Sequence, residues 1–406
     1  MNVTITPGLL RGAITPPPSK SQAHRLLIAA ALADGESRIE HLADSQDIQA
    51  TRRCMAALKA PGEDLPVLDC GESGSTLRFL IPVALALRGG GRFTGRGRLM
   101  ERPQKPYFDL FDEKGIAYRQ EDGVLTVQGR LTPGTFALPG DVSSQFVTGL
   151  LYALPLLEGE STLTVTGPRE SVGYVDLTLR ALAQFGVVPA PEESGWRMAP
   201  QPYHGPSRVQ VEGDWSNAAP WLCLGALGGE SVTVKGMDPA SLQGDKAVCD
   251  VLAQMGARLH ITGDRVTAFR GPLRPTQIDA RDIPDLVPVL AAVAAAIPGT
   301  TTITGAARLR LKESDRLATT AHTLRALGAQ VEEREDGLVI QGRYPLRGGT
   351  VDAAGDHRIA MAAAVAAGAC EAPVTITGAQ AVDKSYPAFW RDLAALGKGV
   401  EGADAP

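Results

Sequence analysis

An internal repeat is the feature that most limits what this chain can fold into. Similar helix endings recur, and their closing glycines lie 70, 72 and 69 residues apart, at Gly186, Gly256, Gly328 and Gly397. A weaker copy ends at Gly115, 71 residues before Gly186, and a shortened first copy ends near Gly62. Six units therefore fill the 406 residues. A fixed period of this size indicates stacked supersecondary units.

Each unit holds two kinds of helix. One kind is amphipathic, as in residues 174–185 and 315–327, and the other is apolar on every face, at residues 26–33, 79–87, 146–157, 218–227, 286–297 and 359–367. A helix without a polar face must be covered all round, so we expect these helices inside and the alternating strands outside. This pattern excludes a TIM barrel and a doubly wound sheet, whose strands are the buried apolar runs. The length predicts two domains of three units each.

Composition excludes several classes of protein. The chain is 44% hydrophobic and 21% charged with a formal net charge of −5, which argues against a nucleic-acid or membrane-surface binder. No signal peptide is apparent at the start, and the longest apolar runs are too short to span a bilayer. The five cysteines show no metal-site spacing and are expected to be buried thiols in a reducing compartment, which predicts a cytoplasmic protein.

The most informative local motif is GESGSTLR, residues 71–78, a turn rich in glycine and hydroxyl groups that runs into an apolar helix. A helix start exposes unbonded N–H groups and partial positive charge, so it can hold an anion. Gly74 would let the backbone approach a ligand closely. A Ser-capped buried helix has the same appearance, so this motif alone does not decide between capping and anion binding.

Cations recur at the helix starts, where capping does not explain them. The positions are Lys20, Arg25, Arg78, Arg102, Lys312, Arg316, Arg358 and Lys384. A cation at a helix start opposes the macrodipole and is unfavourable unless an anion offsets it. In a chain that is acidic overall, this pattern predicts a cleft for a small ligand with several negative charges.

Two carboxylates are candidates for proton transfer. Asp285 opens an entirely apolar helix, and we weigh an N-cap and a catalytic role evenly for it. Glu313 lies between Lys312 and Arg316, where an intrahelical ion pair at i,i+3 is the alternative. Burial would raise the pKa of each carboxyl and the cations would lower it, so the sequence leaves the direction open.

Ten motifs together resemble the enolpyruvyl transferases. They are PSKSQAHR (18–25), GESGSTLR (71–78), MERP (100–103), VSSQF (142–146), ESVGY (170–174), GDWSNA (213–218), IPD (283–285), RLKESDR (310–316), DHR (356–358) and DKSYP (383–387). The resemblance implies two inside-out α/β barrel-like domains of three βαβαββ-type repeats, which close on a cleft. One domain would be residues 1–18 with 214–406, carrying the acid and base, and the other residues 19–213, carrying the phosphate sites.

The resemblance also implies roles for individual residues. Those for shikimate 3-phosphate would be Lys20, Ser21, Arg25, Ser143, Ser144, Ser171, Tyr174, Asp285 and Lys312. Those for the phosphate of phosphoenolpyruvate would be Gly74, Arg102 and Gln145, and those for its carboxylate Arg316, Arg358 and Lys384. Lys20 would contact phosphoenolpyruvate as well as shikimate 3-phosphate. Asp285 would deprotonate the 5-hydroxyl, Glu313 would protonate the methylene carbon, and Lys20 would assist catalysis.

The implied reaction moves an enolpyruvyl group from phosphoenolpyruvate to the 5-hydroxyl of shikimate 3-phosphate by addition and elimination, in the route to chorismate. It implies no metal or organic cofactor and only small-molecule partners, without nucleic acid or membrane, and we expect a monomer. The chain departs from the family at Glu72 and Arg308, where relatives carry Asn.

Three alternatives compete with this interpretation. A sister enzyme acts on UDP-N-acetylglucosamine, but its loop carries a cysteine that residues 91–102 lack. A phosphate-loop kinase would need a G-x-x-x-x-G-K-[ST] motif, and the sequence has none. A module that only binds would not need Lys20, Asp285 and Glu313 together.

Overall fold

The computed structural model describes residues 1–168, 170–228, 230–397 and 399–402. The chain divides into two compact units, which we call unit 1 (Met1–Ser19 with Glu212–Pro406) and unit 2 (Lys20–Val211). Both chain ends belong to unit 1, because the first strand, β1 (Asn2–Ile5), pairs with the last, β22 (Val400–Glu401). Each unit has its own hydrophobic core.

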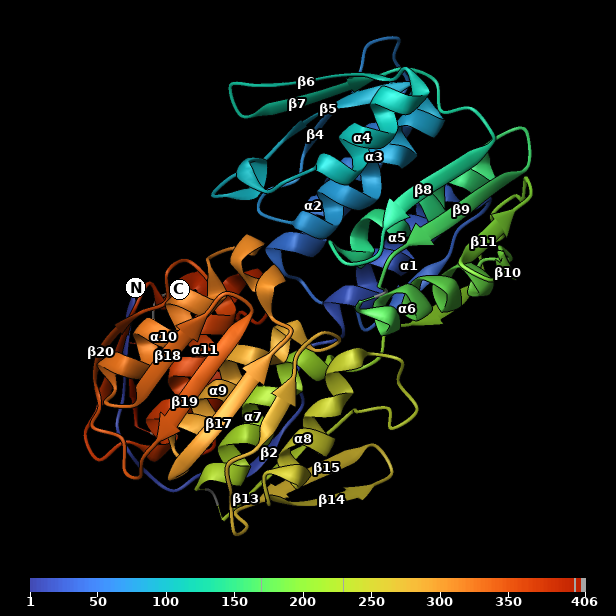
Figure 1. The fold of residues 1–406 in the computed structure, drawn as a ribbon. Helices are drawn as coiled ribbons and strands as arrows, with labels where there is room; N and C mark the ends of the chain where they lie inside the picture. Colours follow the sequence, from blue (N-terminus) through green and yellow to red (C-terminus); the bar gives the residue numbers. More distant parts are fainter. Residues whose placement is uncertain (169, 229, 398, 403–406) are drawn as a thin grey trace. The chain divides into compact units, whose positions relative to one another are not determined.

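The described part of unit 1 has six α-helices and three four-stranded sheets (Figure 1). The helices are α7 (Trp215–Leu227), α8 (Val248–Gln254), α9 (Val287–Ala295), α10 (Arg316–Ala326), α11 (His357–Ala366) and α12 (Phe389–Ala395). The first sheet has the order β2 (Arg11–Ile14), β13 (Ser231–Val234), β15 (Arg265–Phe269), β14 (Arg258–Thr262). The second has the order β16 (Gln277–Asp279), β17 (Gly299–Thr304), β19 (Gly337–Gly342), β18 (Gln330–Arg334). The third has the order β20 (Gly349–Asp352), β21 (Val374–Thr377), β1, β22.

Unit 2 repeats this plan with one sheet shortened. Its helices are α1 (Lys20–Leu32), α2 (Gln46–Lys59), α3 (Gly74–Arg88), α4 (Lys105–Lys114), α5 (Ser144–Ala153) and α6 (Val172–Gln184). One sheet has the order β4 (Val67–Asp69), β5 (Gly90–Thr94), β7 (Val124–Gln128), β6 (Ala117–Glu121). Another has the order β8 (Thr135–Pro139), β9 (Ser161–Thr166), β11 (Gly195–Met198), β10 (Ala190–Glu192). The third holds only β12 (Arg208–Gln210) and β3 (Arg38–Glu40).

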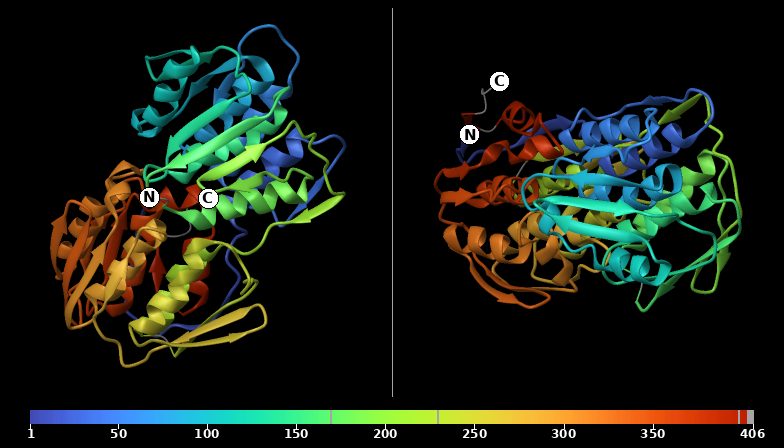
Figure 2. Two further views of the ribbon diagram at one scale, coloured as in Figure 1. Left: turned by 45° about the vertical axis from the view of Figure 1, so that its right-hand side comes forward. Right: turned by 90° about the horizontal axis from the view of Figure 1, so that it is seen from above.

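All five four-stranded sheets follow one rule, which confirms the repeat. In each, a parallel pair of strands is extended by two antiparallel strands, as in β16–β17–β19–β18, whose strands lie side by side in Figure 2 (orange). The fully formed unit is therefore βαβαββ, for example β4–α3–β5–α4–β6–β7. The two-stranded sheet belongs to the copy predicted to be shortened: α2 is followed directly by β4, with no hairpin.

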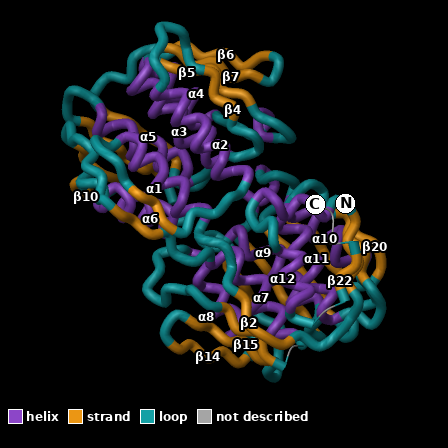
Figure 3. Tube along the Cα trace, turned by 180° about the vertical axis from the view of Figure 1, so that it is seen from behind, coloured by secondary structure: helices purple, strands orange, loops and turns teal. Residues whose placement is uncertain are grey.

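Three of the six helices predicted to be apolar on all faces are buried throughout, whereas the segment 26–33, which α1 spans to Leu32, is partly exposed and α3 ends with Leu87 exposed. Every residue of α7, α9 and α11 is buried, and the strands lie outside these helices, which confirms the inside-out arrangement (Figure 3). Several helices end one to four residues away from the expected position, as at 286–297, where α9 ends at Ala295, and at the end of α5. The segment 146–157 is helical only to Ala153 and continues as a 3₁₀ turn over Leu154–Leu156, because Pro155 cannot donate the next helical hydrogen bond.

The described residues include no helix with the length and apolar character that a bilayer crossing requires. All five cysteines are buried free thiols, as the sequence predicted.

Candidate active site

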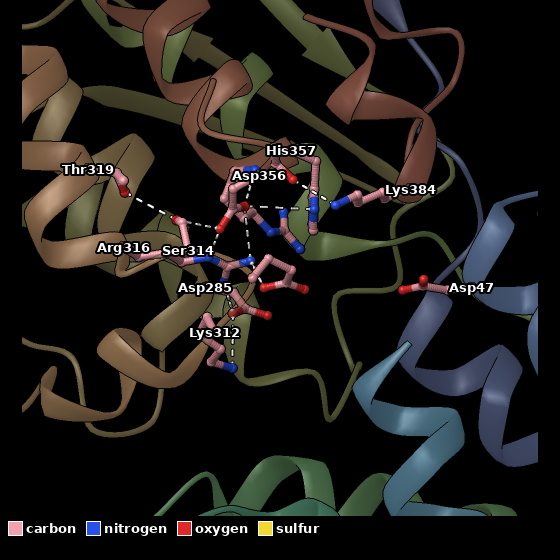
Figure 4. A network of polar contacts seen from close by, with 12 residues as sticks. Asp47, Asp285, Lys312, Ser314, Arg316, Thr319, Asp356, His357 and Lys384 are labelled. Carbon is pink, nitrogen blue, oxygen red and sulfur yellow. Dashed lines mark hydrogen bonds and ion pairs between the residues drawn. The ribbon is translucent and has the colours of Figure 1, made fainter. Parts of the chain in front are cut away.

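The candidate site of unit 1 centres on Arg316, the first residue of α10. Its guanidinium contacts three carboxylates (Figure 4): Nη1 lies 2.7 Å from Asp285 Oδ1, Nη2 lies 2.7 Å from Glu313 Oε2, and Nε lies 2.8 Å from Asp356 Oδ2. The Arg316 side chain is only 2% exposed. Burial alone would lower its pKa, but Asp356, Glu313 and Asp285 together raise the pKa above its ordinary value.

Asp356 holds this guanidinium in place. It is the N-cap of α11, where its side chain accepts from the Arg358 backbone N–H at 2.9 Å. It also accepts from Ser314 Oγ at 3.0 Å and from Arg316 Nη2 at 3.2 Å, in addition to the Nε contact. A fully buried carboxylate with these donors is rigidly oriented, so the orientation of Arg316 is set by the fold.

Asp285 makes ion pairs and is not a helix cap. It lies in a 3₁₀ turn (Pro284–Leu286) ahead of α9, and neither helix start has a side-chain cap bond, so the capping alternative is wrong. Besides Arg316, it faces Lys312 Nζ at 3.5 Å. Burial would raise the pKa of this carboxyl, but Lys312, Arg316 and Arg358 hold the pKa well below its usual range. Asp285 is therefore an anion at neutral pH.

Glu313 pairs with Arg316 at i,i+3, as one alternative for it predicted. The pair is not intrahelical, however, because α10 begins at Arg316 and its N-cap is Asp315, which accepts from the Ala318 N–H. Glu313 thus lies in the turn before the helix, with its carboxylate on the same guanidinium as Asp285.

Two more predicted cations of unit 1, Arg358 and Lys384, donate to backbone carbonyl oxygens. Arg358 Nη1 donates to the Ser216 carbonyl at 2.8 Å, and Lys384 Nζ donates to the Gly355 carbonyl at 2.7 Å. The Ser216 hydroxyl donates to Asp245, a buried carboxyl that the sequence did not single out. Burial and the charge of Asp285 raise the pKa of Asp245 to about 7.

In unit 2 the GESGSTLR turn forms the start of α3. Ser73 is the N-cap and accepts from the Thr76 N–H at 3.1 Å, so the capping interpretation is correct for this residue. The Arg102 guanidinium lies directly against Gly74: a Cβ added at position 74 would be 2.5 Å from Arg102 Nη1. The glycine therefore lets the arginine approach the helix start, which no side chain at 74 would permit without a shift.

The start of α5 meets the start of α3 through Gln145. Its Nε2 donates to Ser75 Oγ at 3.0 Å, and its Oε1 accepts from Arg78 Nη1 at 2.8 Å. Ser143 caps α5, accepting from the Gln145 N–H at 3.3 Å, and Ser144 is the first helical residue. Thus Gly74, Arg102 and Gln145, the three residues assigned by resemblance to one phosphate, are brought together.

A second basic group joins α1 to α6. Arg25 donates to the carbonyl oxygens of Ser21 and Tyr174 at 2.6 and 2.8 Å, and to Thr178 Oγ1 at 2.8 Å. Burial lowers the pKa of Arg25 to about 10. Ser171, the N-cap of α6, has a left-handed backbone with φ of 56°. Such a conformation is uncommon outside glycine and often marks functional sites.

Lys20, the first residue of α1, forms an ion pair with Asp47 of α2 at 2.8 Å.

The two residues that depart from the family pattern, Glu72 and Arg308, contact other parts of the chain. Glu72 turns its carboxylate toward Gly97, where an added Cβ would lie 2.9 Å from Oε2. Arg308 donates to the Arg281 carbonyl. Both side chains thus have structural contacts of their own.

Sequence reasoning assigned no role to Asp356, Asp47 or Asp245, and it counted Arg78 among the cations of the predicted cleft without giving it a role in binding either substrate. Both Asp356 and Arg78 belong to the quoted motifs. Asp356 directly precedes a helix and Arg78 lies in the first turns of one, and these positions were the signal that could have found them. For Asp47 and Asp245 the sequence offers no comparable signal. Within the described ranges, no cluster of three His, Cys, Asp or Glu side chains could hold a metal ion.

Comparison with known proteins gives a consistent result. The family model for EPSP synthase (3-phosphoshikimate 1-carboxyvinyltransferase) matches residues 5–393. The 3-phosphoshikimate 1-carboxyvinyltransferase of Clostridium novyi is 43% identical, with 98% of this chain and 97% of that protein covered. That of Clostridium acetobutylicum is 45% identical, with 98% of each chain covered.

Solved structures agree. EPSP synthase from Acinetobacter baumannii matches with a TM-score of 0.78 and 27% identity, over 98% of this chain and 99% of that one. The enolpyruvyl transferase NikO from Streptomyces tendae has the same fold, with a TM-score of 0.78 at 23% identity over 100% of this chain and 99% of that one.

Proposed function

The chain belongs to the EPSP synthase family, and on this basis we propose that it transfers the enolpyruvyl group of phosphoenolpyruvate to the 5-hydroxyl of shikimate 3-phosphate. The products are 5-enolpyruvylshikimate 3-phosphate and inorganic phosphate. The observation that carries the assignment of residues is the meeting of the predicted base and acid, Asp285 and Glu313, on the guanidinium of Arg316.

Residues of unit 2 bind the two phosphates in this proposal. The phosphate of phosphoenolpyruvate takes the amide of Gln145, the guanidinium of Arg102 and the N–H groups at Gly74, since helix starts and cations bind phosphate. The 3-phosphate of shikimate takes hydroxyl groups and cations at several helix starts. These groups are Ser21, Arg25, Ser143, Ser144 and Ser171, with Tyr174 beside them and Lys20 shared by both substrates.

Residues of unit 1 bind the carboxylate of phosphoenolpyruvate, through Arg316, Arg358 and Lys384. Arg316 already holds three carboxylates, so the incoming one competes with Asp285 and Glu313 for the same N–H groups. A competing anion weakens the hold of Arg316 on Asp285, and the pKa of Asp285 then rises toward a value useful for a base. Substrate binding and activation of the base are therefore coupled.

The chemistry proceeds by addition and elimination. Asp285, positioned with Lys312 near the acceptor, takes the proton of the 5-hydroxyl as its oxygen bonds to C2 of phosphoenolpyruvate. Glu313 gives a proton to C3, which completes a tetrahedral adduct. The Glu313 carboxylate then takes a proton back from C3 as the C2–O bond to phosphate breaks, which produces the enol ether, and the proton held by Asp285 leaves with the phosphate, so both carboxyl groups return to their starting states. General acid and base groups contribute about 10²–10⁴-fold each in such steps, and the cations neutralise the developing charge.

One assay tests this function and its alternatives. Release of inorganic phosphate from phosphoenolpyruvate is measured with shikimate 3-phosphate, with UDP-N-acetylglucosamine, and with neither. We expect release only with shikimate 3-phosphate. Release only with the sugar nucleotide would assign the chain to the sister activity, and release with neither acceptor would leave it a binding module.

The setting of the enzyme is part of the same proposal. We expect a monomer that acts on small molecules in the cytoplasm, consistent with five buried free thiols. Sedimentation of the purified chain tests the monomer: a mass near 42.6 kDa supports it, and twice that mass contradicts it.

A further inference from the structure

Arg78 is a buried cation that the proposed reaction does not use. It lies one turn inside α3, after the anion-binding turn, and is 5% exposed. Its Nη1 donates to Gln145 Oε1 at 2.8 Å, its Nη2 donates to the Pro103 carbonyl at 3.1 Å, and its Cζ lies 4.7 Å above the Phe146 ring. All three groups are neutral. A guanidinium so enclosed is placed to hold other residues and is poorly placed to bind a ligand itself.

The contact with Gln145 decides how its amide faces. A guanidinium only donates hydrogen bonds, so it requires the carbonyl oxygen of the amide and not the NH₂ group. Oε1 therefore faces Arg78, and Nε2 faces the start of α3, where one of its hydrogens reaches Ser75 Oγ. The NH₂ group has a second hydrogen to offer to an anion. With the amide reversed, an oxygen would face the phosphate and repel it.

The contact of Arg78 with Pro103 helps to position Arg102, the other side chain proposed to bind the phosphate. Pro103 directly follows Arg102, whose guanidinium lies against Gly74. The backbone here is further tied by Gln104 Nε2, which donates to the Arg102 carbonyl at 3.1 Å. Arg78 thus links α3 to both segments that carry the proposed phosphate ligands, Gln145 on α5 and Arg102 before α4.

We propose that Arg78 is a positioning residue for the phosphate site: it sets the orientation of the Gln145 amide and anchors the Arg102–Pro103 segment, without touching the substrate. This inference rests on the proposed function only for the identity of the anion. The arrangement itself predicts a site for a phosphate group, so binding of inorganic phosphate tests it independently of turnover.

The first test is a double-mutant cycle with inorganic phosphate as the probe, titrated calorimetrically, and with KM for phosphoenolpyruvate as a second readout. Arg78→Met and Gln145→Ala are each expected to weaken phosphate binding about tenfold, which is about 1.4 kcal/mol. Because Arg78 acts partly through Gln145, the double variant should lose well under the hundredfold that independent effects would give. KM for shikimate 3-phosphate should change less than twofold.

The matched control is Arg88→Met at the other end of α3. Arg88 donates to the backbone carbonyls of Leu58, Ala60, Gly62 and Asp64, so its loss should lower the melting temperature and leave phosphate binding unchanged. Equal losses of phosphate binding in the Arg78 and Arg88 variants would show a general structural effect and overturn the proposal. A hundredfold loss of phosphate binding in the double variant, the product of the two single losses, would overturn it as well.

Gln145→Glu tests the orientation even if Arg78→Met does not fold. The new carboxylate keeps the contact with Arg78 and turns it into an ion pair, so the melting temperature should be maintained or rise. Phosphate binding should fall further than in Gln145→Ala, because a negative oxygen replaces the NH₂ group. Phosphate binding equal to that of the wild type would overturn the proposed orientation. A wild type that binds phosphate but forms no product would contradict the proposed function alone.

Discussion

The two units neutralise their buried arginines in opposite ways. In unit 1, Arg316 carries three carboxylates, and a fourth, Asp245, is linked through Ser216 to Arg358. In unit 2, Arg25 and Arg78 are held by carbonyl, hydroxyl, amide and aromatic groups. The central cation of the candidate site in unit 1 is therefore paired with carboxylates, whereas Arg25 and Arg78 of unit 2 contact neutral groups.

This difference teaches which chemistry each unit suits. A guanidinium solvated by neutral dipoles has positive charge to offer to an anion, which fits phosphate binding. A guanidinium surrounded by carboxylates binds a further anion only in competition with them, but it holds acids and bases in fixed positions, which fits proton transfer. The directions of the pKa shifts agree, since the pKa of Arg316 is raised and that of Arg25 is lowered to about 10.

The proximity of two carboxyl groups in unit 1, Asp245 and Asp285, predicts the largest effect. Burial and the charge of Asp285 raise the pKa of Asp245 to about 7 from its ordinary 3.8, while Arg358 and the Ser216 hydroxyl act in the opposite direction. The folded chain then binds a proton that the unfolded chain has released, so this contribution to stability is complete below pH 4 and is lost as the pH rises to about 7. About three pKa units correspond to about 4 kcal/mol as a ceiling.

Asp245→Asn should remove this loss. The free energy of unfolding is measured by urea titration at pH 4 and pH 8. Relative to the wild type, the variant should be more stable at pH 8 than at pH 4, by up to about 4 kcal/mol. Asp250→Asn, on the exposed side of α8, is the control and should show no such gain. If the difference between Asp245→Asn and the wild type is the same at both pH values, the fold does not raise the pKa of Asp245.

The second effect concerns the two carboxylates on Arg316. Asp285→Asn and Glu313→Gln should each lower kcat by at least about 100-fold while KM for either substrate changes only a few-fold, because each removes a proton-transfer group and keeps the shape. Steady-state phosphate release measures both constants. Glu333→Gln, which breaks the Arg310–Glu333 pair elsewhere in unit 1, should leave kcat near the wild-type value.

The third effect lies in unit 2 and concerns the close approach of Arg102 to Gly74. Gly74→Ala places a Cβ 2.5 Å from Arg102 Nη1, so the guanidinium must move from the start of α3. We expect KM for phosphoenolpyruvate to rise about tenfold, as the loss of one charge-assisted hydrogen bond implies. Gly228→Ala is the control, because its Cβ would make only an ordinary contact of 3.6 Å. An unchanged KM would show that Arg102 does not bind the phosphate.

Most of the fold could be predicted from the sequence, because the repeat period and the all-apolar helices are local patterns with one packing solution. The shortened copy was predictable for the same reason. The helix end at Ala153 was not, since the apolar pattern continues through Pro155 to Leu157.

The site was only partly predictable. Motifs showed which residues gather at helix starts but not which groups they contact there. The Arg316–Asp356 pair spans 40 positions and the Arg78–Gln145 bond spans 67, so both depend on how separate repeats pack. For the same reason the direction of the Asp285 pKa could not be derived from the sequence, because opposing effects of burial and charge have to be weighed in space.

The smallest predicted effect concerns Lys20, which departs from the contrast between the two units. Lys20 in unit 2 is paired with a carboxylate, Asp47, at 2.8 Å, and both side chains are mostly buried. Asp47→Asn should return the charge of Lys20 to the site and tighten binding of inorganic phosphate about threefold at low ionic strength, in keeping with the modest worth of such pairs. Asp109→Asn, which breaks the exposed Lys105–Asp109 pair on α4, removes the same formal charge and should leave phosphate binding unchanged. If both variants tighten binding equally, net charge is responsible. If only Asp47→Asn does, Asp47 limits the positive charge that unit 2 offers to phosphate, and neutral solvation of its other cations is what makes the site basic.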